Sequence, residues 1–131
     1  MSKLTRQNAI LPFPTSSSQE DSLFGLIVGL FNGVLIPLSP GSAAAPLGVC
    51  VHYDEAGSPA SVALMSGGLG GTVKLKLDGA VSVGDFLILG DGGLIYADPE
   101  TGAREQVGQA MEAGVSGDLV ECVIFKPIVL A

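Results

Sequence analysis

From Gly48 onward, apolar residues form short runs that are separated by turn residues. In the segment 72–77, three apolar residues at odd positions alternate with one threonine and two lysines at even positions. Residues two apart in a strand lie on the same face, so this segment predicts a strand with one buried face. Similar runs span 49–53, 61–65, 86–89, 94–96, 106–112 and 119–125, and Pro127 is expected to end the last of them. We therefore predict an all-β fold, a small compact barrel or sandwich of about seven or more short strands.

The preceding stretch, residues 23–46, contains no charged residue. Leu26–Val28 and Val34–Ile36 are rich in β-forming residues and flank Asn32–Gly33, a dipeptide typical of hairpin turns. This pattern predicts two short buried strands. Glycine also recurs every four residues from Gly25, which leaves a second interpretation: a glycine-faced helix packed on a sheet or on a copy of itself. The apolar run is shorter than the roughly 20 residues of a membrane-spanning helix, so no membrane span is expected.

Residues 1–22 have the composition of an extended arm. Pro12 and Pro14 disfavour helix, and the run from Thr15 to Ser18 offers no side chains for a core. A disordered tail would explain the prolines and serines equally well, but not the apolar residues among them. We therefore expect an arm that orders against a partner through these apolar residues: Leu4, Ile10, Leu11 and Phe13.

Composition limits the function of the chain. Its 131 residues suit one domain, and 47% hydrophobic against 15% charged residues predicts that it folds. Thirteen acidic residues against six Lys and Arg give a formal net charge of −7, so a nucleic-acid partner is not expected. The charges in residues 1–46 cancel, so the whole net charge lies in residues 47–131. The apolar run does not follow its cations directly, so export by a signal sequence is not indicated either.

The chain therefore divides into an extended N-terminal arm (1–22) and a single β module (23–131). Within the module, an uncharged apolar segment (23–46) precedes an acidic barrel (47–131). The uncharged segment is expected either to complete the core of the single chain or to lie between copies. Its candidate contacts between copies are the larger apolar residues of the two predicted strands and their flanks: Leu26, Leu30, Phe31 and Leu35.

Candidate chemistry is sparse. The only histidine, His52, is two residues from Cys50, so in a regular strand both side chains would share a face. A small hydrolase that uses this pair as nucleophile and base is one alternative, and two packed or rim side chains are the other. The acidic residues occur singly in turns, where aspartate has a local structural role. We therefore expect no catalytic site, no metal and no cofactor.

Two stretches resemble a known family. The first, GGTVKLKLDGAVSVGD, contains Gly71–Val73, Gly79–Val81 and Gly84–Asp85 in the spacing of small tailed-phage head decoration proteins, also called capsid cement proteins. The second, VGQAMEAGVSGDLVECV, is similar to their C-terminal motif. It matches at Val107–Gly108, Ala110, Ala113, Gly117–Asp118 and Glu121, and departs from the motif at Cys122. The resemblance covers residues 47–127, and residues 1–46 match no known pattern.

The resemblance implies a non-enzymatic structural protein of a bacteriophage virion with a β-clip- or β-tulip-like module. Such a protein would be made in the host cytoplasm and would bind the outer surface of the mature capsid. Its partners would be the major capsid protein and its own copies, as a homotrimer or less often another oligomer at three-fold or quasi-three-fold positions. A tail, baseplate or fibre-associated β module of a virion is the alternative structural function.

Overall fold

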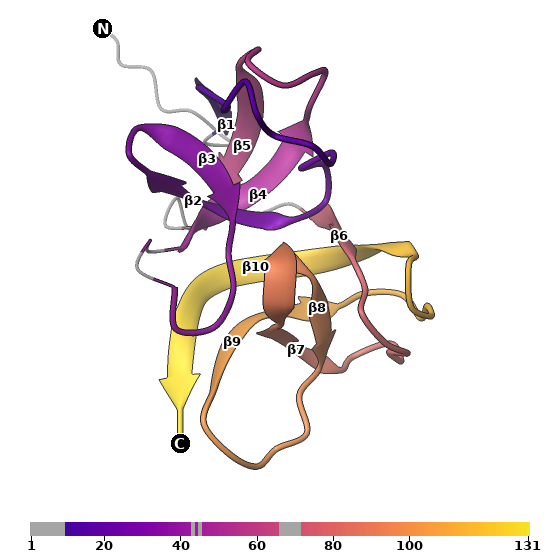
Figure 1. Ribbon diagram of the computed structural model, residues 1–131. Helices are drawn as coiled ribbons and strands as arrows, with labels where there is room; N and C mark the ends of the chain where they lie inside the picture. Colours follow the sequence, from indigo (N-terminus) through magenta and orange to yellow (C-terminus); the bar gives the residue numbers. More distant parts are fainter. Residues whose placement is uncertain (1–9, 43, 45, 66–71) are drawn as a thin grey trace, which may run out of the picture.

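The computed structural model describes residues 10–42, 44, 46–65 and 72–131. Their ten strands form two antiparallel five-stranded sheets, one above the other in Figure 1. The first sheet has the order β1-β5-β4-β2-β3, with bounds Ile10–Phe13, Ala60–Leu64, Pro46–His52, Ile27–Phe31 and Val34–Pro37. The second has the order β6-β10-β9-β7-β8, with bounds Val73–Lys76, Leu119–Leu130, Arg104–Ala110, Phe86–Leu89 and Ile95–Ala97. The prediction of an all-β fold is confirmed.

The hairpin predicted from the Asn32–Gly33 dipeptide is confirmed. β2 and β3 pair from Val28↔Pro37 to Phe31↔Val34, and the two turn residues have positive φ angles of 51° and 80°. Positive φ at both central positions is the turn geometry that suits the twist of two paired strands. The helix considered for this segment does not form. Gly33 belongs to this turn, whereas Gly29 is buried inside β2.

A backbone junction at Gly25 joins the two sheets. Its N–H donates to the Cys50 carbonyl of β4 at 2.9 Å, and its own carbonyl accepts from Lys76 N–H of β6 at 2.9 Å. Its φ of +79° is a conformation that glycine adopts without strain. One cluster of buried side chains then continues across the junction, from Ile27 and Val49 of the first sheet to Leu75 and Leu87 of the second.

Each sheet curls until its end strands are bridged. In the first sheet, Thr15 forms a parallel bridge with Leu35 of β3, and its Oγ1 donates to the Ser58 carbonyl at 2.6 Å. In the second sheet, Leu77 forms the same kind of bridge with Ile95 of β8. A second cluster of buried side chains, which includes Val28, Leu35 and Val62, lies inside the curled first sheet. Closure of this kind reduces the number of open strand edges.

Two predictions about strands need correction. Pro127 does not end the last strand, because β10 continues to Leu130. The pairing with β9 skips from Ile124↔Gly108 to Ile128↔Gln106, so three residues of β10 face one residue of β9. Pro127 lies in this irregularity, where its missing N–H leaves no gap in the ladder. Residues 10–13, placed in an arm outside the module, form β1 and pair with β5 from Ile10↔Ala63 to Phe13↔Ala60.

Candidate functional site

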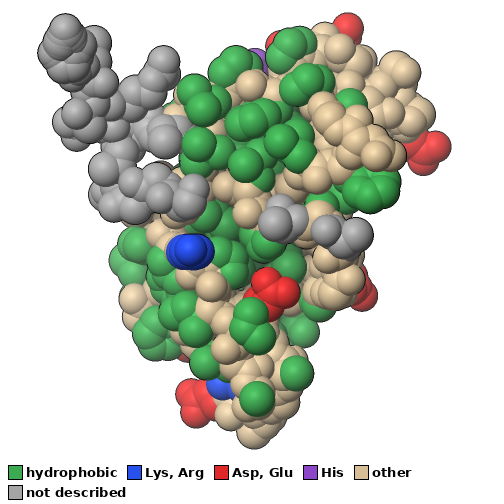
Figure 2. Space-filling view, turned by 90° about the vertical axis from the view of Figure 1, so that its left-hand side faces the viewer, with side chains coloured by type: hydrophobic (Ala, Val, Ile, Leu, Met, Phe, Trp, Pro, Cys, Tyr) green, Lys and Arg blue, Asp and Glu red, His purple; other side chains and the backbone are tan. Residues whose placement is uncertain are grey.

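The first-sheet half of the described chain exposes four large apolar side chains, which we call the first-sheet apolar surface. Their exposed fractions are 40% for Ile10, 39% for Phe24, 38% for Leu30 and 47% for Phe31. Ile10 begins β1, Leu30 and Phe31 end β2 beside the hairpin turn, and Phe24 precedes the Gly25 junction. Figure 2 shows hydrophobic side chains on this upper part of the molecule and on its lower part as well.

Charge is absent from the segment that supplies most of this surface. Residues 22–51 contain no charged side chain, although the whole chain has a net charge of −7. The first-sheet acidic residues lie instead in the loops around Glu20–Asp21 and Asp54–Glu55. Covering the first-sheet apolar surface with a partner would therefore bury apolar area without burying an unpaired charge. Exposed large apolar side chains without a charged neighbour in their segment suit a protein–protein contact.

The proposed arm residues differ in their accessibility. Leu4 lies outside the described residues. Leu11 and Phe13 are half-buried in β1, and Phe13 packs against the core of the first sheet. Ile10 is the most exposed of the three that the structure describes. Their role as capsid contacts stays a prediction, and it applies best to Ile10.

The four proposed contacts between copies divide into two pairs. Leu26 is 9% exposed and Leu35 is fully buried, so the core of the single chain already encloses both side chains. They are not available to a second copy in this fold. Leu30 and Phe31 are exposed and remain the candidates for such a contact. Sequence analysis missed Phe24. This bulky residue could have been noticed because it comes directly before Gly25, the first of the glycines that recur every four residues.

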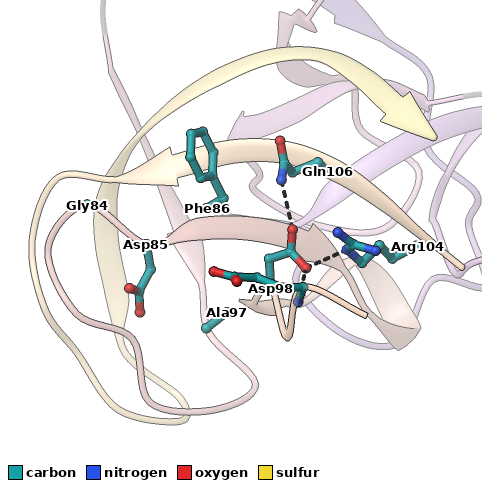
Figure 3. A pocket seen from close by; sticks show the side chains of 8 residues that line it. Gly84, Asp85, Phe86, Ala97, Asp98, Arg104 and Gln106 are labelled. Carbon is teal, nitrogen blue, oxygen red and sulfur yellow. Dashed lines mark hydrogen bonds and ion pairs between the residues drawn. The ribbon is translucent and has the colours of Figure 1, made fainter. Parts of the chain in front are cut away.

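A polar pocket of about 490 Å³ opens beside the turn between β8 and β9. Figure 3 shows that Asp98 lies at its centre, between Arg104 and Gln106 of β9. Asp98 accepts hydrogen bonds from Gln106 Nε2 at 2.7 Å and from the Glu100 N–H at 2.8 Å. Arg104 Nε forms an ion pair with Asp98 Oδ1 without hydrogen-bond geometry, while Arg104 Nη1 donates to the Gly102 carbonyl at 2.8 Å. These contacts stabilise the turn between β8 and β9.

The contacts keep Asp98 ionised. Burial raises the pKa of the Asp98 carboxyl, but the hydrogen bonds from Glu100 and Gln106 and the nearby Arg104 charge lower it more, so the net pKa is below its ordinary value. A carboxylate with a lowered pKa and occupied oxygens is a weak proton acceptor. We therefore assign the Asp98 pocket a structural role in holding the β8–β9 turn.

Replacing Asp98 with asparagine should lower the free energy of unfolding by about 1–3 kcal/mol near neutral pH, because the Arg104 side chain, which is 13% exposed, loses its counter-charge. A lowered folded-state pKa contributes stability above the unfolded-state pKa, and this contribution is lost as the pH falls through the folded-state value. The difference between wild type and Asp98→Asn should thus be constant above about pH 5 and shrink below it. Urea unfolding across pH measures this difference, with the exposed Asp78→Asn as control. A difference independent of pH would contradict the assignment.

The structure does not bring Cys50 and His52 together as a reactive pair. β4 has a register shift between them, from Cys50↔Val62 to His52↔Ser61, so the regular alternation of faces is lost. The Cys50 side chain is fully buried and its thiol donates to the His52 backbone carbonyl at 3.4 Å. The imidazole is exposed and its Nε2 lies 3.2 Å from Asp54 Oδ1.

Both thiols should resist alkylation in the folded protein. Burial raises the pKa of Cys50, and burial also raises the pKa of Cys122 to about 12, so little reactive thiolate forms near neutral pH. We expect iodoacetamide to modify neither residue on the time scale on which it modifies both in urea. His52→Ala should leave the rate unchanged, as followed by mass spectrometry. Rapid alkylation of Cys50 that depends on His52 would support the hydrolase alternative.

Within the part of the chain that the structure describes, no three His, Cys, Asp or Glu side chains are grouped to hold a metal ion. Over the same residues, no helix has the length and apolar character needed to cross a membrane. No protein-family model matches the chain, and no curated protein matches it either.

Proposed function

We propose that the chain is a decoration protein of a tailed-phage head, which binds the outer surface of the mature capsid and clamps neighbouring major capsid subunits. One observation carries the proposal most strongly: the first-sheet apolar surface is neutral, whereas the rest of the chain is acidic. An apolar surface suits a stable contact with a protein lattice, and an acidic remainder suits the solvent-facing side of a particle. The motif resemblance over residues 47–127 points to the same function.

The clamp would stabilise the shell by mass action. A protein that binds only the mature lattice lowers the free energy of that state relative to the precursor. Binding should therefore depend on the state of the shell. Co-sedimentation of the purified protein with expanded heads and with precursor heads, both assembled without it, tests this dependence. We expect binding to expanded heads alone, and equal occupancy of both would contradict the clamp.

Within the first-sheet apolar surface, Leu30 and Phe31 are the residues through which copies would contact one another, which leaves Ile10 and Phe24 to contact the shell. Leu30→Asp places a charge at a position that is already 38% exposed, so the single chain should still fold. If these residues lie between copies, the variant should elute as a soluble monomer while the wild-type protein elutes as an oligomer, measured by light scattering after gel filtration. Val115→Asp, at a 60% exposed position of the second-sheet half, is the control. An intact Leu30→Asp oligomer would contradict the contact.

A further inference from the structure

The C-terminal part of β10 is a strand with one open side. β6 pairs with β10 only from Leu119 to Cys122, whereas β9 pairs with it as far as Leu130. Among the described residues, no strand lies beside Val123–Leu130 on the side opposite β9. Figure 1 shows this part of β10 bending away from β6 and running along the margin of the molecule to the C-terminus. Apart from Pro127, which has no N–H, its outward N–H and C=O groups have no partner strand among the described residues.

The side chains of this edge are mostly apolar. Val123 is 36% exposed, Ile128 47% and Val129 77%, the last being the largest exposed fraction among the large apolar side chains of the described chain. Lys126 is the only charged residue from Cys122 to Ala131, and among the described residues it forms no ion pair. An added strand would thus meet apolar side chains and one unpaired positive charge.

We propose that Val123–Leu130 of β10 accepts an additional β-strand from the shell protein, an extended apolar segment with an acidic residue that pairs with Lys126. The inference rests on the proposed function and names how one part of the contact is made. Main-chain hydrogen bonds supply the attachment in strand addition, and the side chains select the partner. The carboxylate of the partner would satisfy the one charge on this edge.

A second copy of the chain is a poorer occupant of this edge. The same edge of a second copy carries Lys126 and no acidic residue, so it could not supply a carboxylate to pair with this charge. Only Ile128, Val129 and Leu130 form a regular ladder with β9 beyond the irregularity. Pairing over so few residues buries far less than the roughly 800 Å² per partner of a stable complex. A short strand is effective when a larger surface holds the partner at the same time, as the first-sheet apolar surface would.

Hydrogen–deuterium exchange with and without expanded heads tests the proposal. Amides within Val123–Leu130 should exchange more slowly on the heads than in free protein. Val129→Glu should weaken head binding by at least about tenfold, because it sets a negative charge against an acidic partner strand. Lys126→Glu should weaken it as well, while Lys126→Arg should not. Val83→Glu, at a 67% exposed position of a second-sheet turn, is the matched control and should bind like the wild-type protein.

The outcomes separate the two proposals. Binding to heads with unchanged exchange in Val123–Leu130 would overturn the strand addition and leave the decoration function standing. Slower exchange there without heads, which increases with protein concentration and persists in Leu30→Asp, would identify a second copy as the occupant and overturn the shell partner. Failure of the wild-type protein to bind heads would overturn the decoration function and, with it, this partner.

Discussion

Replacing Gly48 with alanine should lower the free energy of unfolding by about 3 kcal/mol or more, a large part of the total stability of a marginally stable domain. Gly48 lies in the centre of β4, paired with Val28 on one side and with Leu64 on the other. A Cβ atom at this position would lie 2.1 Å from the carbonyl oxygen of Ala63. This oxygen is part of the neighbouring backbone, so a change of side-chain rotamer cannot relieve the clash.

Gly79→Ala is the matched control for this substitution. Its Cβ would be 3.8 Å from the nearest atom, Tyr96 Cβ, which is an ordinary contact distance. Chemical unfolding of both variants, followed by circular dichroism, should show a large loss of stability for Gly48→Ala and a change within about 0.5 kcal/mol for Gly79→Ala. Equal stability of the two variants would contradict the close pairing of β4 and β5.

Deleting residues 1–20 should lower the free energy of unfolding by about 3–5 kcal/mol more than deleting residues 1–9 does. The longer deletion removes β1 and the contact of Phe13 with the core. It also removes the Thr15 hydrogen bond to Ser58 and the Thr15↔Leu35 bridge that closes the first sheet. The shorter deletion leaves all of these in place.

Urea unfolding of the two deletions measures this difference, and head binding is measured on the shorter one alone. The sequence pattern places residues 1–22 in an arm outside the folded module. Because β1 belongs to the first sheet, the shorter deletion tests only the part of the arm before Ile10, which includes Leu4. Similar stability of the two deletions would mean that β1 is dispensable, contrary to its four paired residues.

Local patterns in the sequence predicted the β elements well where each residue determines its own conformation. Asn32–Gly33 fixed a hairpin because both residues adopt positive φ readily. The lysines of the 72–77 segment indicated the exposed face of β6, since Lys74 and Lys76 are exposed and Leu75 is fully buried. In both cases neighbouring residues carry the whole signal, so no knowledge of distant contacts is needed.

The features that sequence analysis missed depend on distant partners. The register shift in β4 separates Cys50 from His52, but the shift exists only because β5 pairs with both residues. β1 forms because β5 offers an edge, not because residues 10–13 alternate clearly. Pro127 is tolerated inside β10 because the irregularity opposite β9 requires no N–H there.

The candidate site was only partly visible in the sequence for the same reason. The charge-free stretch identified the segment that carries Leu30 and Phe31, but its pattern could not separate them from the enclosed Leu26 and Leu35. Which side chains of each strand are buried depends on the tertiary fold. Val28 and Leu35 belong to the buried cluster inside the first sheet. The resulting exposed set is the surface on which the proposed capsid contact depends.

Imaging of heads by cryo-electron microscopy tests the central proposal most directly. Purified protein is mixed with expanded heads that were assembled without it, and the reconstruction is compared with that of untreated heads. We predict added density on the outer surface at local three-fold or quasi-three-fold positions, with Ile10 and Phe24 of the first-sheet apolar surface against the shell. A reconstruction of treated heads without added density, or with density only at the tail, would contradict the account.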